Sequence, residues 1–195
     1  MNPKTEQLRS LEKRMAECSA CPALTRTKTV FDRDGNPDAE LVFIGQAPGK
    51  GEDREGVPFF SSPGSAGQFL NDEILKLMSL ERKDVFVCNI VGCLPPREGD
   101  RDKPPSGDEA KKCRKFLDET LAIIKPKFIC CLGTFASRKL LGTSKPLQTK
   151  QGENVLRGKV HDHKGISVVC TYHPSSGKKK EILEDIRCLM EKMGK

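Results

Sequence analysis

The chain has 195 residues, a length that suits one domain with a hydrophobic core of its own. Hydrophobic residues make up 36% of the sequence and charged residues 31%, which excludes a fibrous protein and an intrinsically disordered one. The net charge of +7 suits an anionic partner such as nucleic acid, although many basic proteins are merely soluble. We expect a single domain over residues 1–195.

No apolar run in the sequence approaches the roughly 20 residues that a membrane-spanning helix needs. The first residues, MNPKTEQLRSLEKRM, carry charges where a signal peptide would be apolar. We therefore expect a cytoplasmic monomer with no membrane partner.

Four short apolar runs predict buried strands, because each is too short for a free-standing helix and is bounded by loop or charged residues. They are Leu41–Ile44, Val85–Val91, Phe128–Leu132 and Ile166–Thr171. Helical patterns lie between and after them, at residues 66–78, 108–124 and 178–193. Ser106 and Glu109 form a predicted capping box before the second helix.

This alternation of strands and helices predicts an α/β fold, a three-layer α/β/α sandwich with a central four-stranded, mostly parallel sheet. Such sheets carry their functional loops beyond the carboxyl ends of the strands. The segments after Gly45, Asn89, Gly133 and Thr171 are therefore the places to search for a site.

Nine cysteines are many for a chain without an export signal, and an odd number cannot pair completely as disulfides. Cys18 and Cys21 form a C-x-x-C pair, and Cys93 and Cys113 follow where the fold can bring them near it. Four thiolates fit structural zinc or a [4Fe–4S] cluster, and the spacing does not decide between them. A redox pair or a chance C-x-x-C is the alternative. The other five cysteines are expected in the core.

Three loop segments carry unusual residues in a recognisable order. They are Gly45-Gln46-Ala47-Pro48-Gly49 after the first strand, Ser62-Pro63-Gly64-Ser65-Ala66-Gly67 before the next helix, and Thr171-Tyr172-His173-Pro174-Ser175 after the last strand. With the C-x-x-C pair, Asn89, Cys93 and Pro95-Pro96, the chain resembles the family-4 uracil-DNA glycosylases, the iron-sulfur branch of that superfamily. The resemblance runs from Cys18 to the last helix.

The resemblance implies a role for each matching position. Cys18, Cys21, Cys93 and Cys113 would hold a [4Fe–4S] cluster, which favours iron-sulfur over zinc. Phe59 would stack on a base flipped out of DNA, and Asn89 would read the edge of that base. His173 would stabilise the leaving uracil; a histidine buried in the core is the alternative. The remaining base-binding positions would be Gly45, Ala47 and Ser175.

Two positions depart from the family pattern. The family usually has Glu where this chain has Gln46, and Gln can orient a water molecule but cannot accept its proton at neutral pH. Ala47 occupies the position of the catalytic Asp in the classical enzymes. We expect Glu52 or Asp53 from the same loop to supply a carboxylate, or else leaving-group stabilisation by His173 to carry the reaction.

The sequence thus predicts a monofunctional glycosylase that removes a deaminated base from DNA, with Gln46 placing the attacking water. Two alternatives stay open: a binder of lesions that has lost its activity, and an iron-sulfur domain that binds a nucleotide or a partner through the glycine-rich loop. Whether the base is uracil, hypoxanthine or xanthine does not follow from the sequence. Lys178, Lys179 and Lys180 would touch DNA phosphate, or simply begin a solvated helix.

Overall fold

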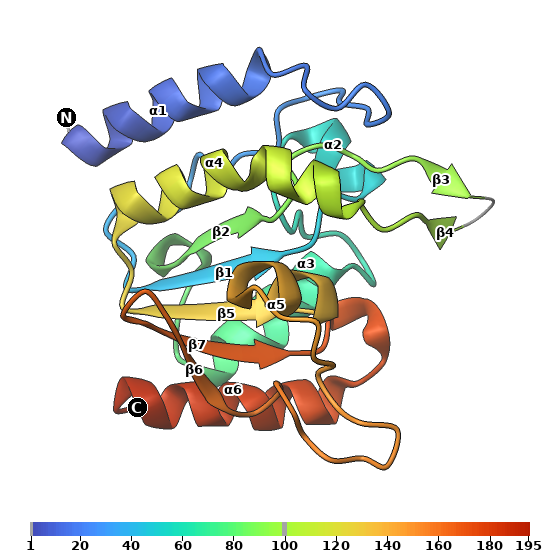
Figure 1. The fold of residues 1–195 in the computed structure, drawn as a ribbon. Coiled ribbons are helices and arrows are strands. Elements are labelled where there is room, and N and C mark those ends of the chain that lie inside the picture. The colour runs from blue at the N-terminus through green and yellow to red at the C-terminus, as the bar shows by residue number, and fades with distance from the viewer. Residues whose placement is uncertain (1, 99–100) are drawn as a thin grey trace.

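The computed structural model describes residues 2–98 and 101–195, and its centre is a five-stranded sheet in the order β2-β1-β5-β7-β6 (Figure 1). The strands are β1 (Leu41–Gly45), β2 (Phe86–Asn89), β5 (Phe128–Leu132), β6 (Val160–His163) and β7 (Ile166–Thr171). Strands β2, β1, β5 and β7 run parallel to one another, and β6 runs antiparallel to β7 at the edge of the sheet. The mostly parallel sheet is as predicted, but it has five strands and not four.

The missed strand, β6, has the sequence Val-His-Asp-His and is only partly buried. It lies on an edge of the sheet, where one side of the backbone has no strand partner and polar side chains are tolerated. Continuous apolar runs are typical of buried inner strands, and β6 contains no such run, so the sequence does not predict it.

Helices cover both faces of the sheet, which confirms the three-layer arrangement (Figure 1). One face packs against α1 (Pro3–Ala16), α4 (Gly107–Ile124) and α5 (Thr134–Leu141), and the other against α3 (Ala66–Phe69), a π-helix (Leu70–Leu75) and α6 (Lys179–Met193). Alternation along β1 divides the two cores, because Val42 and Ile44 belong to the first and Leu41 and Phe43 to the second.

The three predicted helices are present with small differences. The capping box of α4 is confirmed: Ser106 Oγ accepts the N–H of Glu109 at 3.2 Å, and the Glu109 carboxylate accepts the N–H of Ser106 at 2.6 Å. The first predicted helix continues from α3 into the π-helix. Helices α1, α2 (Lys50–Glu55) and α5 were not predicted, nor were the short 3₁₀ turns Arg82–Asp84 and Pro174–Ser176.

The segment from Pro95 to Gly107 contains a two-stranded ribbon of β3 (Arg97–Glu98) and β4 (Arg101–Asp102). Residues 99–100 lie outside the described part of the chain. Among the helices that the structure describes, none is both long enough and apolar enough to cross a membrane.

Candidate active site

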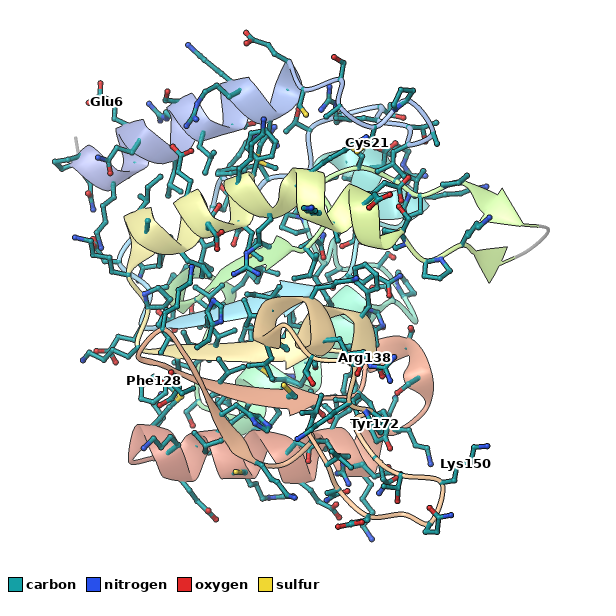
Figure 2. The ribbon with its side chains drawn as sticks, viewed as in Figure 1. Glu6, Cys21, Phe128, Arg138, Lys150 and Tyr172 are labelled. Carbon is teal, nitrogen blue, oxygen red and sulfur yellow. The ribbon has the colours of Figure 1, made fainter. Side chains whose placement is uncertain are left out.

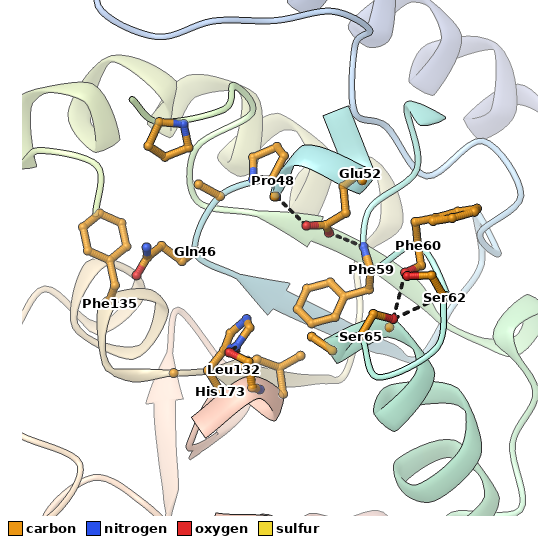
Figure 3. A pocket seen from close by; sticks show the side chains of 18 of the residues that line it. Gln46, Pro48, Glu52, Phe59, Phe60, Ser62, Ser65, Leu132, Phe135 and His173 are labelled. Atoms are coloured by element: carbon orange, nitrogen blue, oxygen red, sulfur yellow. Dashed lines mark hydrogen bonds between the residues drawn. The ribbon is translucent and has the colours of Figure 1, made fainter. Parts of the chain in front are cut away.

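A cavity of about 620 Å³ opens at the carboxyl edge of the sheet (Figure 3). The loops after β1, β5 and β7 enclose it together with part of the segment 59–67. These loops meet because parallel strands bring their carboxyl ends to the same edge. Its lining includes Gln46, Ala47, Glu52, Phe59, Leu132, Phe135, His173 and Ser175.

His173 follows β7 and faces Phe59 across this cavity (Figure 3). The centroids of the two rings are 5.8 Å apart, and the ring planes are inclined by 38°. Burial lowers the pKa of His173 from 6.5 to about 4. The imidazole is therefore neutral at pH 7, with one ring nitrogen protonated and the other free to accept a hydrogen bond.

Ser175 determines which nitrogen of His173 carries the proton. The backbone nitrogen of Ser175 lies 3.2 Å from Nδ1 of His173, and the Ser175 hydroxyl oxygen lies 2.7 Å from the same atom. A backbone N–H can only donate, so Nδ1 accepts and the proton of the neutral ring is assigned to Nε2. His173 thus offers an uncharged N–H donor at the cavity.

Phe59 is held in a left-handed backbone conformation with φ of 52°, which is uncommon for a residue other than glycine. One carboxylate oxygen of Glu52 accepts the N–H of Phe59, and the other accepts the N–H of Gly49 at 2.6 Å. Burial raises the pKa of Glu52, and these two hydrogen bonds act in the opposite direction. Glu52 therefore connects the loop after β1 to the residue whose ring forms one wall of the cavity.

Asn89 ends β2 and lies in register with Gly45 at the end of β1. A Cβ atom on Gly45 would lie 2.4 Å from Oδ1 of Asn89 and 2.6 Å from Cε2 of Phe59. Both side chains therefore pack directly against the backbone of Gly45. Oδ1 of Asn89 is buried and has no hydrogen-bond partner among the described residues. A buried amide oxygen left without a partner marks a place where a ligand can bind.

Gln46 and Ala47 follow β1, and both line the cavity. Figure 3 shows Gln46 on the side where Phe135 lies and Phe59 on the other, with His173 between them. Among the described residues that line the cavity, Glu52 carries the one carboxylate. The two residues that depart from the family pattern are therefore both part of the cavity wall.

Asp53 lies elsewhere than its predicted catalytic role requires. It is 4% exposed and is not one of the residues that line the cavity. Both of its carboxylate oxygens lie 3.0 Å from the backbone nitrogen of Thr27, which donates to them. Asp53 thus fastens α2 to the segment that follows the C-x-x-C pair, and the structure does not support a catalytic role for it.

The four predicted metal ligands come together at a second place. Cys18 and Cys21 lie in the turn after α1, Cys93 follows β2 and Cys113 is on α4, and all four line one cavity of about 440 Å³. Figure 2 shows Cys21 in the segment beyond α1, above the N-terminal half of α4. In the part of the chain that the structure describes, no group of three or more metal-binding side chains is arranged to hold a metal ion.

Burial has the largest effect on the pKa values of these cysteines, and two neighbouring groups act against it. Burial raises the pKa of Cys93 to about 11, while the positive charge of Arg26 acts to lower it. Burial also raises the pKa of Cys113, against a hydrogen bond from the backbone of Gly92. A cation and a backbone N–H directed at sulfur are typical partners of metal-bound thiolates.

Comparison with known proteins identifies the family. The sequence model of the Uracil DNA glycosylase superfamily matches residues 33–185. The chain belongs to this superfamily. This confirms the resemblance that the loop motifs carry.

Several similar proteins share the name Type-4 uracil-DNA glycosylase. The one from Thermotoga maritima is 36% identical over 177 residues, which are 90% of this chain and 85% of that protein. The one from Archaeoglobus fulgidus is 35% identical over 176 residues, covering 88% and 83%. The one from Sulfurisphaera tokodaii is 34% identical over 180 residues, covering 88% and 76%.

In this uracil-DNA glycosylase homologue, sequence reasoning missed two contributions to the cavity. Phe135 lines it from the start of α5, although the segment after Gly133 was one of the places marked for searching. Glu52 was considered only as a source of a carboxylate for water, whereas its oxygens bind backbone N–H groups of Gly49 and Phe59. Sequence alone gives no signal for the second, because it depends on the backbone conformation of Phe59.

Proposed function

We propose that this protein removes uracil from DNA by hydrolysing the bond between the base and its sugar, leaving an abasic site. The observation that carries the proposal is that Phe59 and His173 line one cavity, while Asn89, which does not line it, meets Phe59 at Gly45, in a member of this superfamily. Relatives named Type-4 uracil-DNA glycosylase support uracil as the base.

Binding would begin with a uracil flipped out of the duplex, because the glycosidic bond is out of reach inside the base stack. The ring of Phe59 offers a stacking surface. The amide of Asn89 would pair with the edge of the base, satisfying the buried Oδ1. Cytosine presents the opposite donor and acceptor pattern there and would leave these groups unpaired, which is the basis of strong discrimination.

Bond cleavage leaves negative charge on the departing uracil. His173, neutral and protonated on Nε2, would donate to the carbonyl oxygen on which that charge develops. A neutral donor that is already desolvated needs little reorganisation in the transition state. Gln46 would orient the attacking water through its amide; no carboxylate is present at that position, and the proton that the water loses would end on the departing uracil anion.

We also propose that Cys18, Cys21, Cys93 and Cys113 hold a [4Fe–4S] cluster. The four side chains line the same cavity, and the family-4 resemblance favours an iron-sulfur cluster over zinc. The cluster would act structurally, joining the segment after α1 to the loop after β2 and to α4.

The DNA partner is supported by charge. The chain carries a net charge of +7, and Ser175, which bonds His173, is followed closely by Lys178, Lys179 and Lys180. We propose that these lysines approach phosphates beside the flipped nucleotide. Raising the salt concentration should then weaken binding to DNA of any sequence.

The test is release of uracil from an oligonucleotide with one uracil, detected as strand cleavage after alkali, with anaerobically purified protein. Release by the wild type that is lost in His173→Ala would establish the glycosylase. Failure to release uracil, hypoxanthine or xanthine would overturn it. Tight binding of uracil DNA without cleavage would instead favour a lesion binder, the second candidate, for which Gln46 and Ala47 are the supporting observations.

A further inference from the structure

The chain that leads into His173 is fixed by polar groups outside the cavity. Thr171, the last residue of β7, donates its hydroxyl to Oδ2 of Asp185 at 2.7 Å. Asp185 lies on α6 and is 2% exposed. The carbonyl of Thr171 accepts the N–H of Gly133, which follows β5, at 2.9 Å. The side chain of Thr171 therefore connects the end of β7 to α6, and the backbone of Thr171 connects it to the residue that follows β5.

Arg157 binds the same carboxylate and is 4% exposed. Its Nε and Nη2 atoms lie 3.0 Å from Oδ2 and Oδ1 of Asp185, a bidentate pair. Nη2 also donates to the carbonyl of Glu181 at 2.9 Å, and Nη1 donates to Oδ1 of Asn154 at 3.0 Å. The buried guanidinium is thus well satisfied, as a buried charge must be.

Tyr172, the residue between Thr171 and His173, is held by the same group. The guanidinium carbon of Arg157 lies 5.4 Å from the centroid of the Tyr172 ring, within range of a cation–π interaction. The hydroxyl of Tyr172 donates to Oε1 of Gln148 at 2.9 Å. Figure 2 shows Tyr172 beside the loop that carries Lys150, which lies between β5 and β6 in the chain.

The backbone of this loop is shaped around the carboxylate. Gly158 has φ of +62°, and a Cβ atom there would lie 2.6 Å from Oδ1 of Asp185. Its N–H donates to the carbonyl of Cys170 in β7 at 3.2 Å. Only glycine allows the loop to approach both the strand and the buried ion pair this closely.

We propose that Asp185 and Arg157 are positioning residues for His173, an inference that rests on the proposed glycosylase function. They form none of the walls of the cavity, yet they fix the two residues before the imidazole. A buried ion pair adds little stability over well-packed apolar residues of the same size, so fold stability alone explains it poorly. A displacement of a reacting group by about 1 Å can lower a rate by up to about a hundredfold.

The sharpest test removes one hydroxyl and leaves the ion pair intact. Replacing Asp185 would leave the buried Arg157 with only the exposed Glu184, 3.7 Å from its Nη2, as a counter-charge, and that variant risks unfolding. Thr171→Val keeps the shape of the side chain and loses only the bond to Asp185, whereas Thr171→Ser keeps the hydroxyl. Thr120→Val is the matched control, since the buried Thr120 hydroxyl donates to the carbonyl of Phe116 within α4, at 2.9 Å.

The rate of uracil release is measured in single turnover with enzyme in excess, and DNA affinity is measured separately. Thr171→Val should release uracil roughly tenfold more slowly with unchanged DNA affinity, while Thr171→Ser and Thr120→Val should keep the wild-type rate. A wild-type rate in Thr171→Val would overturn the proposal. So would an equal loss of rate in Thr120→Val, because the effect would then be general destabilisation.

A second readout does not depend on activity. NMR signals of the His173 imidazole, assigned by their loss in His173→Ala, report its surroundings directly. The proposal expects these signals to shift in Thr171→Val but not in Thr120→Val. If the wild type releases no uracil, the proposed function fails while this measurement still decides whether the network positions His173. Unshifted signals in Thr171→Val would overturn the positioning role.

Discussion

The buried carboxylate of Glu52 accepts the backbone N–H of Phe59, and Phe59 has φ of 52°. A residue with a side chain in this conformation stores strain, which persists only where the surroundings fix it. The second oxygen of Glu52 binds Gly49, and Gly67 is so close that a Cβ atom on it would lie 2.1 Å from the Phe59 carbonyl. The position of the Phe59 ring is thus set by contacts to the backbone of Phe59.

Glu52→Gln is therefore expected to damage the site although it preserves size. Glu52 receives two N–H donors on two oxygens, and Gln has one oxygen and one NH₂ group, so one donor loses its acceptor. We expect a loss of about 1–3 kcal/mol in the free energy of unfolding. The rate of uracil release should fall as well, because the ring of Phe59 loses its fixed position. Urea unfolding and single-turnover cleavage measure the two effects.

Glu55→Gln on the same helix is the control for this substitution. Glu55 pairs with its neighbour Arg54 at 2.7 Å near the surface, and such pairs contribute little to stability. Both stability and rate should be unchanged in this variant. A fully active Glu52→Gln protein would show that the hydrogen bond to Phe59 does not position the ring.

Gly45→Ala tests the convergence of the base-binding residues. The added Cβ atom would lie 2.4 Å from Oδ1 of Asn89 and 2.6 Å from the ring of Phe59, so one of them must move. We expect uracil release to fall by about tenfold or more, since both groups would bind the base. Gly51→Ala, in helix α2 after the loop that follows β1, is the control, because a Cβ atom there meets nothing within 4 Å. Equal rates in the two variants would contradict the proposed base site.

Much of the fold followed from the sequence because its inner strands are continuous apolar runs. The stretches at residues 41–44 and 129–132 are fully buried, and continuous apolar runs of this kind are typical of strands in a parallel sheet covered on both faces. Edge strand β6 carries two histidines and an aspartate, and its pairing with β7 depends on tertiary context. The π-helix Leu70–Leu75 likewise reads as an ordinary helical pattern.

The site was predictable to the extent that loop motifs identify a family. His173, Phe59 and Gln46 line one cavity, as that resemblance implied. The structure does not support the catalytic role predicted for Asp53. Two adjacent acidic residues of one helix have different partners: Glu52 lines the cavity, whereas Asp53 accepts a hydrogen bond from Thr27. Arg157 was not considered, because only the folded chain brings it to the residues before His173.

The low pKa of His173 predicts a pH dependence of stability. Its pKa is about 4 in the folded protein and 6.5 ordinarily. Between pH 4 and pH 6.5, the unfolded chain therefore binds a proton at this histidine that the folded protein does not bind. This group therefore leaves stability unaffected above pH 6.5 and lowers it progressively as the pH falls toward 4. From pH 7 to pH 5 the wild type should lose about 1–2 kcal/mol more than His173→Gln.

Urea unfolding of both proteins at pH 7 and pH 5 measures this difference. His161 and His163 are present in both proteins, so their own titration cancels in the comparison. Identical losses would show that His173 keeps an ordinary pKa, and the neutral donor proposed for uracil release would then lack its basis.

Iron content tests the four cysteines. Anaerobically purified protein should contain about four iron atoms per chain, and Cys113→Ser should lose iron and unfold at a lower urea concentration. Cys188→Ser is the control, because Cys188 lies on α6 and is not among the residues of the cysteine-lined cavity. One zinc ion per chain and no iron would replace the cluster with a structural zinc site.

Gln46→Glu introduces the carboxylate that the family-4 resemblance leads us to expect at this position. Gln46 lines the cavity together with His173, and a carboxylate there can take the proton of the attacking water, which an amide cannot. We expect single-turnover uracil release to rise by roughly tenfold or more at pH 7 and to fall again at acidic pH as the introduced carboxylate is protonated. Gln46→Ala should be slower than the wild type, because it removes the group that orients the water. If Gln46→Glu is no faster than the wild type, activation of water does not limit the rate. The rate is then limited by bond cleavage assisted by His173, as expected when the base departs before the water bonds to the sugar.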